Sequence, residues 1–318
     1  MKKLTIMEKG TGMTDAREEG WRAKNVSSIR ETLNRIGAIR DDRIELFSSR
    51  TRDNPNLKVF RDTTSRVIFI DNHYVGDSKY VSGDYRKQPK PLTNSAGIDY
   101  EDITDSERRY NSYRQFLTGK DICDFGCGAG SFLKRAQSIA QSVCGIELQK
   151  NYADELNNLD ITCYESIQNI TQPLDVVTLF HCLEHLPNPT SVLQELRASL
   201  KTDGDGTLII EVPHARDFLI ETLKSKEFID FTLWSQHLVL HTRESLRLLL
   251  EDAGFKNIYI EGVQRYSIAN HFQWLSNKKS GGHKSLLSTL QTPDLIESYE
   301  KALARIDATD TIIAIATT

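Results

Sequence analysis

Apolar and polar positions alternate between strand-like and helix-like spacing from residue 119 onwards. Short apolar runs are separated by stretches in which apolar residues recur every three or four positions. The strand-like runs lie at 120–124, 142–147, 160–164, 174–180, 206–212, 257–261 and 311–316. This pattern predicts an α/β fold with a mostly parallel sheet covered by helices on both faces. In such a sheet, ligands bind at the carboxyl ends of the strands.

Helix boundaries are marked between these runs. Asn188-Pro189 predicts an N-cap followed by a proline at the first helical position. Thr242 predicts the N-cap of a helix that ends at Gly254, because glycine readily adopts the left-handed conformation that closes helices. Thr292-Pro293 predicts the start of another helix in the same way. These signals place helices between strands, as the alternation requires.

Three segments interrupt the alternation. Residues 1–118 open with an amphipathic helix carrying Val26, Ile29, Leu33 and Ile36, and continue as a polar stretch without clear periodicity. We expect a mostly helical arm or cap there, which binds the acceptor, pairs with a second subunit or packs on its own sheet. The remaining 119–318 form the main domain, in which 213–241 and 263–310 are long inserts. Inserts at the ligand-bearing edge of a sheet commonly act as lids.

Composition narrows the class of protein. The 318 residues include no apolar run near the roughly 18–20 residues that span a bilayer. Residues 1–118 carry 22 Lys and Arg against 18 Asp and Glu, and the remainder 18 against 26, so neither part has the basic stripe of a nucleic-acid binder. None of the five cysteines forms a C-x-x-C pair, which favours free thiols in a reducing cytoplasm.

A glycine-rich turn follows the first strand-like run of the main domain. Asp124-Phe-Gly-Cys-Gly-Ala-Gly130 leads into a helical pattern, and its glycines let the chain turn sharply and expose backbone N–H groups to a ligand. The G-x-G-x-G spacing differs from the G-x-G-x-x-G of dinucleotide-binding turns. The turn therefore predicts a cofactor cradle, with a purely packing role as the alternative.

Glu147 ends the next strand-like run, 17 residues after Gly130. A carboxylate at that position can accept hydrogen bonds from both hydroxyls of a ribose that lies across the strand ends. Together with the glycine turn, Glu147 favours a nucleoside-containing cofactor over a solvated acidic loop.

A histidine-rich segment, Phe180-His-Cys-Leu-Glu-His185, ends the fourth run. Its H-x-x-E-H order matches a zinc motif in which two histidines share a helix face. Asn188-Pro189 marks the helix start only after the segment, so these histidines would not share one. We therefore expect no metal, and the segment either faces the acceptor through Glu184 or His185 or makes structural hydrogen bonds. The other histidines, without a G-x-S-x-G elbow, support no hydrolase.

These motifs together resemble the class I S-adenosylmethionine (SAM)-dependent methyltransferases. The resemblance is to the branch that includes the ubiquinone-pathway O-methyltransferases and many sugar or surface-glycan methyltransferases. It covers about 119–262 and the last strand, and rests on residues 124–130, Glu147, 180–189, 206–213 and the stretch from 234–238 to 253–255. Residues 1–118 and 263–310 match no pattern, and acceptor choice is expected there.

The resemblance implies a Rossmann-like sheet of seven strands whose last strand, 311–316, runs antiparallel. SAM would lie across the glycine turn with Asp124 near its amino-acid part and Glu147 on its ribose. Residues 164–166 would border the adenine, and Phe180 and His181 would line the methionine end through their backbone. The cofactor-binding positions are then Asp124, Gly126, Cys127, Gly128, Gly130, Glu147, Leu148, Tyr164, Glu165, Ser166, Phe180 and His181.

The expected activity is methyl transfer from S-adenosyl-L-methionine to a small-molecule or saccharide acceptor, with a hydroxyl as the favoured accepting group and surface-glycan biosynthesis as one setting. A hydroxyl has to lose its proton, and we expect His185 as the base, oriented by Glu184, with His181 and His237 as rivals. No nucleic acid or membrane span is expected, and a homodimer stays open. The alternatives are an NAD(P)-dependent oxidoreductase or epimerase and a non-catalytic SAM-binding scaffold protein.

Overall fold

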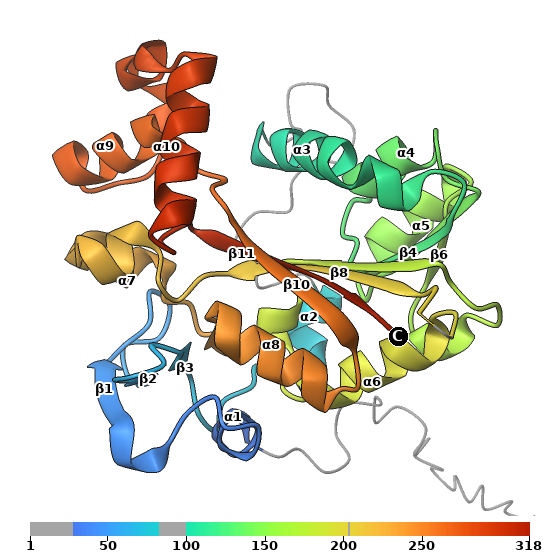
Figure 1. The fold of residues 1–318 in the computed structure, drawn as a ribbon, viewed down its shortest axis with the longest axis horizontal. Coiled ribbons are helices and arrows are strands. Elements are labelled where there is room, and N and C mark those ends of the chain that lie inside the picture. Colours follow the sequence, from blue (N-terminus) through green and yellow to red (C-terminus); the bar gives the residue numbers. More distant parts are fainter. Residues whose placement is uncertain (1–27, 83–99, 203) are drawn as a thin grey trace, which may run out of the picture.

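Seven strands form the main sheet of the computed structural model, which describes residues 28–82, 100–202 and 204–318 (Figure 1). Their spatial order is β10-β11-β8-β7-β4-β5-β6. Each coincides with a predicted strand-like run. The bounds are β4 Asp121–Phe125, β5 Ser142–Ile146, β6 Thr162–Tyr164, β7 Val176–Phe180, β8 Thr207–Pro213, β10 Lys256–Val263 and β11 Thr311–Thr317.

Strand direction confirms the predicted topology. β8, β7, β4, β5 and β6 pair in parallel, whereas β11 pairs antiparallel with both β8 and β10. The chain adds β5 and β6 on one side of β4 and then returns to add β7 and β8 on the other. The strand order therefore reverses between β4 and β7, and a ligand crevice is expected at the carboxyl ends of these two strands.

Helices cover both faces of this sheet (Figure 1). On one face lie α3 (Tyr100–Leu117), α4 (Ser131–Ala136) and α5 (Lys150–Asn158). On the other lie α6 (Pro189–Ser199) and α8 (Arg243–Asp252). Each layer buries an apolar stripe, such as Leu133 and Leu156 on the first face and Leu193 and Leu249 on the second. The sheet is thus held between two apolar layers. This packing fixes the position of the strand ends, which carry the polar residues of the predicted site.

The predicted helix starts are present, with one difference. Thr242 forms a capping box with Ser245, and the Thr292 hydroxyl accepts a hydrogen bond from the Leu295 N–H at the start of α10 (Pro293–Arg305). Asn188 occupies the N-cap of α6 with Pro189 inside the first turn, but the Asn188 side chain makes no capping hydrogen bond. Pro189 is therefore the stronger of the two start signals at this helix.

The N-terminal arm contains strands that the sequence pattern did not predict. After α1 (Ile29–Arg35) and a 3₁₀ turn (Asp41–Arg43) come β1 (Ile44–Ser48), β2 (Val59–Asp62), β3 (Ile68–Phe69) and α2 (Asp77–Ser82). β1, β2 and β3 form a second sheet with β9 (Val239–Leu240), which belongs to the insert after β8. Of the predicted first helix, Val26 lies outside the described residues.

The two inserts are mostly helical and lie on the β10–β11 side of the main sheet (Figure 1). The first contains a π-helical turn (Phe218–Thr222), α7 (Lys226–Thr232) and β9. The second contains α9 (Ile268–Asn277), 3₁₀ turns at Gly282–Lys284 and Leu286–Leu290, and α10. The shorter turns at Ile167–Asn169 and Leu183–His185 follow β6 and β7 directly. The turn after β7, η3, carries the histidine-rich segment.

A buried ion network joins α3 to the centre of the sheet. Glu211 of β8 is fully buried and accepts two hydrogen bonds from Arg108, at 2.9 Å each, and one from Arg109 at 2.9 Å. The Tyr113 hydroxyl donates to the same carboxylate at 2.8 Å. Residues 100–117 lie in the segment that the sequence pattern assigned to the arm, yet α3 packs on the main sheet through charged as well as apolar contacts.

Asp217 makes stability depend on pH. This buried carboxylate accepts hydrogen bonds from the N–H groups of Leu219 and Ile220, and burial, with a smaller contribution from Asp310, raises its pKa to about 8. Because the folded-state pKa of Asp217 lies above the ordinary value of 3.8, the contribution of this carboxyl group to stability is fully present at low pH. That contribution is lost as pH rises toward 8.

Asp217→Asn should therefore gain stability relative to the wild type as pH rises. The slope is about 1.4 kcal/mol per pH unit for one group, so the difference in unfolding free energy should change by roughly 4 kcal/mol between pH 5 and 8. Urea unfolding at both pH values measures it. Asp294→Asn, on an exposed position of α10, is the control and should show no such change. A constant difference for Asp217→Asn would contradict the prediction.

The sequence predicted free cysteine thiols and no segment that spans a membrane. All five cysteines are free, and Cys123 is fully buried. Within the described ranges, no helix combines the length and the apolar character that crossing a bilayer requires.

Candidate functional site

The glycine turn lies at the carboxyl end of β4, next to the point where the strand order reverses. Gly126, Gly128 and Gly130 have φ angles of 77°, 55° and 69°, in the left-handed region that favours glycine. At Gly126 a Cβ would lie 2.7 Å from the sulfur of Cys182, so only glycine lets the turn pack against the loop after β7. The turn is thus bare backbone facing the crevice.

Glu147 is held over this turn by backbone donors. One carboxylate oxygen accepts a hydrogen bond from the Gly128 N–H at 2.9 Å, and the other accepts one from the Gln149 N–H at 2.8 Å. The Glu147 N–H itself donates to the carbonyl of Tyr164 at 3.0 Å. The side chain is 9% exposed. The carboxylate is therefore oriented before any ligand binds, and each oxygen keeps a lone pair for a hydroxyl donor.

A cavity of about 220 Å³ runs from this carboxylate to the histidine-rich segment. Six of the predicted site residues line it: Gly126, Glu147, Leu148, Glu165, His181 and His185. The rest of its wall comes from Tyr80, Phe125, Ile146, Gln149, Cys182, Leu186 and Trp234. Both ends carry polar groups, and apolar side chains such as Phe125, Ile146 and Leu186 make up much of the wall, which suits a ligand with both characters.

The other predicted residues lie around the cavity without lining it. Cys127, Gly128 and Gly130 shape the turn, Tyr164 supplies the carbonyl that binds the Glu147 N–H, and Ser166 caps the turn after β6 through Gln168. Glu184 lies behind His181 and His185. Asp124 is held by Thr178 of β7, and Phe180 by aromatic side chains of the helices that cover the sheet.

Asp124 is buried beneath the turn. It accepts a hydrogen bond from the Thr178 hydroxyl of β7 at 2.6 Å. Burial raises the pKa of Asp124 to about 7, although the Thr178 hydrogen bond opposes this shift. A cation near the turn would favour the ionised form. Asp124 does not line the cavity, and its expected place near the amino-acid part of SAM stays a prediction.

Phe180 is packed between α3 and α4. Its ring stacks on Tyr113 with centroids 5.9 Å apart and meets Phe132 edge-on at 4.9 Å. The Arg109 guanidinium lies 4.3 Å from the ring centroid. The side chain therefore points into the helix layer, and Phe180 can border the cavity only through its backbone, as the resemblance implied.

Polar side chains gather at the opposite end of the cavity. The Nδ1 of His181 lies 3.4 Å from Glu184 Oε1, and the Nε2 of His185 lies 4.0 Å from the same oxygen. Glu184 is fully buried, and burial raises the pKa of its carboxyl to about 8. Burial lowers the pKa values of His181 and His237 well below the ordinary value. His181 also has a φ of 51°, an uncommon conformation for a residue with a side chain.

The N-terminal arm braces this end of the site. The Ile70 N–H, which follows β3, donates to the Leu238 carbonyl at 2.9 Å, and the Leu238 N–H donates to the Glu184 carbonyl at 2.8 Å. Asp53 accepts hydrogen bonds from the backbone and hydroxyl of Ser235, and Arg52 lies 4.5 Å over the Trp234 ring. The arm therefore sets the position of both Glu184 and the first insert.

Two wall residues, Tyr80 and Trp234, were not predicted as site residues. The His185 ring meets Tyr80 with centroids 6.1 Å apart and Trp234 at 5.8 Å, both edge-on. Trp234 carried a signal, because it begins the stretch of the insert that matches the family. No sequence signal marked Tyr80, because α2 lies in the segment without periodicity. Only the folding of the arm brings Tyr80 to the cavity.

The glycine turn, Glu147 and the histidine-rich segment follow one another along the chain in the order that the resemblance requires. A family model described as a methyltransferase domain matches residues 99–260. This match spans about half of the chain. The chain belongs to this methyltransferase family. The resemblance to the class I SAM-dependent methyltransferases is confirmed, and so is the expectation of an enzyme. The match begins at residue 99, so this methyltransferase domain includes α3.

Curated relatives of the methyltransferase are ubiquinone biosynthesis O-methyltransferases. The protein of that name from Actinobacillus pleuropneumoniae serotype 5b is 35% identical over 133 residues, which are 37% of this chain and 53% of the relative. The one from Haemophilus ducreyi is 38% identical over 104 residues, 28% of this chain and 44% of the relative. The chain spans about half the length of the curated relatives it matches.

Solved structures with a similar fold are also methyltransferases. A SAM-dependent methyltransferase from Archaeoglobus fulgidus is 18% identical with a TM-score of 0.46, covering 68% of this chain and 94% of that one. Magnesium protoporphyrin IX methyltransferase from Synechocystis PCC 6803, with bound S-adenosylhomocysteine, is 17% identical with a TM-score of 0.46, covering 76% and 96%.

Proposed function

We propose that this methyltransferase moves the methyl group of SAM to a hydroxyl of a small-molecule or saccharide acceptor. The observation that carries the proposal is that one cavity joins the glycine turn and Glu147 at one end to His181, His185 and Trp234 at the other. A donor seated on the turn would thus have its reactive end directed at a polar, aromatic-walled space. The printed names of the curated relatives, which are O-methyltransferases, support oxygen as the accepting atom.

The residues at the glycine-turn end fit SAM. Glu147 offers two oriented carboxylate oxygens to the ribose hydroxyls, and Leu148 and Glu165 line the wall beside it for the adenine. Gly126 leaves bare backbone where a Cβ would collide with Cys182. Asp124, beneath the turn, would be drawn into its ionised form by the ammonium group of the methionine part.

Methyl transfer asks the protein mainly for alignment. When bound, SAM supplies a methyl group on a sulfonium: the acceptor oxygen bonds to the methyl carbon as the C–S bond breaks, and the electron pair of the C–S bond stays on the sulfur, which becomes neutral. The cavity residues hold the acceptor in line and exclude water, and well-oriented reactants gain roughly 7–11 kcal/mol. The hydroxyl proton has to leave, and Glu184 and His185 are the polar groups placed to promote that loss.

The acceptor end has the shape and chemistry for a ring. The His185 ring meets both Tyr80 and Trp234 edge-on, so these three side chains form an aromatic part of the cavity wall. Phenols and sugars both bind against aromatic faces while their hydroxyls find polar partners. Tyr80 comes from the arm, which supports a role for residues 28–82 in choosing the acceptor.

Glu147→Ala tests the cofactor assignment. Loss of the carboxylate removes the oriented acceptors for the ribose hydroxyls and frees the N–H groups of Gly128 and Gln149. Two hydrogen bonds to a charged group are worth roughly 3 kcal/mol, so SAM affinity should fall about 100-fold or more. Calorimetry with SAM, S-adenosylhomocysteine and NAD measures it.

Glu251→Ala is the control, because Glu251 is an exposed glutamate on α8 that does not line the cavity. It should change SAM affinity less than 10-fold. Absence of SAM binding by the intact protein, or binding of NAD in its place, would overturn the proposed function. Tight SAM binding without transfer of labelled methyl to any phenol or sugar would instead support the scaffold alternative.

A further inference from the structure

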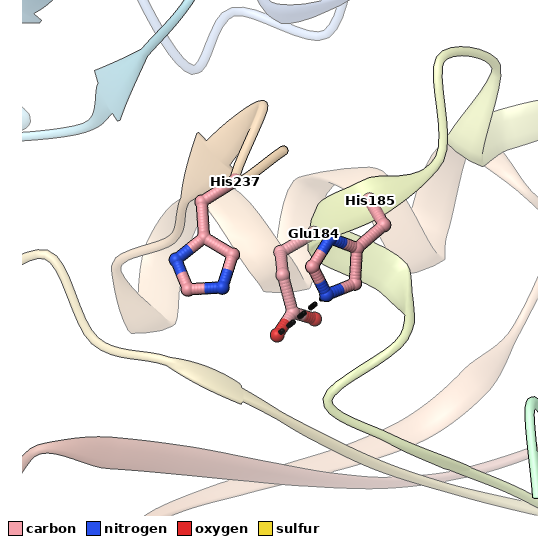
Figure 2. Close-up of side chains that lie close together, drawn as sticks. All are labelled: Glu184, His185 and His237. Atoms are coloured by element: carbon pink, nitrogen blue, oxygen red, sulfur yellow. Dashed lines mark ion pairs between the residues drawn. The ribbon is translucent and has the colours of Figure 1, made fainter. Parts of the chain in front are cut away.

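Glu184, His185 and His237 form a cluster that the proposed cofactor site does not use, and we refer to it as the Glu–His cluster. One ligand atom from each residue lies within 4.8 Å of the others. Figure 2 shows the Glu184 carboxylate between the two imidazole rings, with a ring nitrogen of each histidine directed toward it. Glu184 and His185 come from the turn η3 after β7, and His237 comes from the loop before β9.

The Glu184 carboxylate is in an environment that does not satisfy it. Its side chain is fully buried, and in the described part of the chain neither carboxylate oxygen has a hydrogen-bond partner. A buried carboxyl without hydrogen bonds costs several kcal/mol unless it is paired with a cation or coordinates a metal. The nearest nitrogens, on His181 and His185, lie 3.4 and 4.0 Å away.

His185 is already oriented as a ligand. Its Nδ1 lies 2.8 Å from the Gln236 carbonyl, which can only accept a hydrogen bond, so Nδ1 carries the proton. In the neutral ring, Nε2 then has a lone pair, and Nε2 is the atom that faces Glu184. Metal-binding histidines are typically held in this way, with the second ring nitrogen donating to a carbonyl or carboxylate.

We propose that the Glu–His cluster binds one divalent cation of the zinc type, with an open coordination position facing the acceptor end of the cavity. Two imidazoles and one carboxylate are a donor set found in catalytic zinc sites. Ligand atoms about 2.0–2.2 Å from a tetrahedral ion lie ~3.3–3.6 Å apart. The 4.0 Å between Glu184 Oε1 and His185 Nε2 would therefore have to close by about half an ångström. The ligand atom of His237, which lies within 4.8 Å of the other two, would have to move by up to roughly 1.5 Å.

This site deepens the proposed function and rests on it. A hydroxyl oxygen bound at the open position would release its proton to solvent more readily, because the ion stabilises the alkoxide. The oxygen lone pair would then bond to the methyl carbon. His185 is in that case a ligand and not the base that the sequence suggested. The sequence argument against a metal assumed that His181 and His185 would have to share a helix face, whereas the folded insert supplies His237 instead.

The first experiment measures metal binding by the full chain. Protein dialysed against a chelator is titrated with Co²⁺, and zinc content is measured after incubation with Zn²⁺ and gel filtration. One ion per chain and the intense visible absorption of four- or five-coordinate Co²⁺ are expected. Because the cobalt spectrum is recorded on the unaltered protein, it does not depend on any variant folding. Absence of stoichiometric binding would overturn the proposal.

Variants then locate the site. Glu184→Gln and His237→Ala should each weaken Zn²⁺ binding ~100-fold or more, with the visible Co²⁺ bands lost. His283→Ala, which removes a half-buried histidine from the second insert, is the control and should bind as the wild type does. Wild-type affinity in Glu184→Gln and His237→Ala would overturn the assignment, as would full methyl transfer by chelator-treated protein that contains no metal.

SAM calorimetry on the same samples separates the two proposals. SAM binding without metal binding would overturn the metal site and leave the proposed function standing. Metal binding without SAM binding would overturn the proposed function and leave an ion that stabilises the fold. Binding of both, with methyl transfer restored by Zn²⁺ after chelation, is the expected result.

Discussion

Glu211→Gln is expected to destabilise the protein by about 3–5 kcal/mol, because it removes the negative partner of the buried Arg109 and the partly buried Arg108. Arg108 and Arg109 of α3 both hydrogen-bond to Glu211, and the Tyr113 hydroxyl donates to it as well. Without that carboxylate, the two guanidinium groups keep their positive charge in a largely apolar layer but lose the negative charge that balances it. Urea unfolding at pH 7 measures the loss.

The pH dependence of this loss identifies its cause. Burial of Glu211 opposes ionisation, but Arg109 and Arg108 outweigh it and lower the pKa of Glu211 to about 2. Because this value lies below the ordinary 4.5, the stabilisation is present above about pH 4.5 and is lost as pH falls toward 2. The difference between wild type and Glu211→Gln should therefore shrink between pH 6 and pH 3.

Glu261→Gln is a matched control in the same sheet. Glu261 lies on β10 at a partly exposed position, and its replacement should change the unfolding free energy by less than about 0.5 kcal/mol. A loss under 1 kcal/mol for Glu211→Gln, or one that does not vary with pH, would mean that the buried network contributes little to stability.

His185→Ala is expected to lower the rate of methyl transfer by about 10²- to 10⁴-fold while SAM affinity changes less than 3-fold. The His185 ring lies at the acceptor end of the cavity, against Tyr80 and Trp234, and its Nε2 faces Glu184. Its loss removes the group that helps the hydroxyl to ionise, whether by accepting the proton or by holding an ion. Transfer from methyl-labelled SAM to a panel of phenols and sugars gives the rate, and calorimetry gives the affinity.

His283→Ala again serves as the control and should keep both values. An unchanged rate in His185→Ala would remove His185 from the mechanism. A rate loss matched by an equal loss of SAM affinity would place His185 in the cofactor site instead of the acceptor site.

The main sheet was predictable because its signals are local. Each strand is a short apolar run, and β7 and β8 are buried on both faces, so their residues read as continuous apolar segments. Helix α3 was missed for a physical reason. Its first half buries charged residues, including Arg109, against Glu211, and only its end, from Tyr113 to Leu117, packs through apolar side chains. Helical periodicity of apolar residues cannot reveal a face that is buried through ion pairs.

The candidate site was predictable in part. Gly126 and Glu147 each follow a strand directly, and His185 lies in the short turn after β7, so their chain order places them at one edge of the sheet. Tyr80 and His237 come from the arm and the insert, and their place depends on contacts between segments far apart in the sequence. The strands β1, β2 and β3 were missed because they are short and carry charged residues such as Arg61.

The second sheet has a practical consequence for altering acceptor choice. β9 of the first insert completes a sheet begun by β1, β2 and β3 of the arm, and the same insert's Leu238 backbone binds both Ile70 and Glu184. Grafting the insert of a relative alone would mismatch this edge and displace Glu184. The transplantable unit is the arm together with the insert, and chimeras that exchange both segments are the ones expected to fold with a working site.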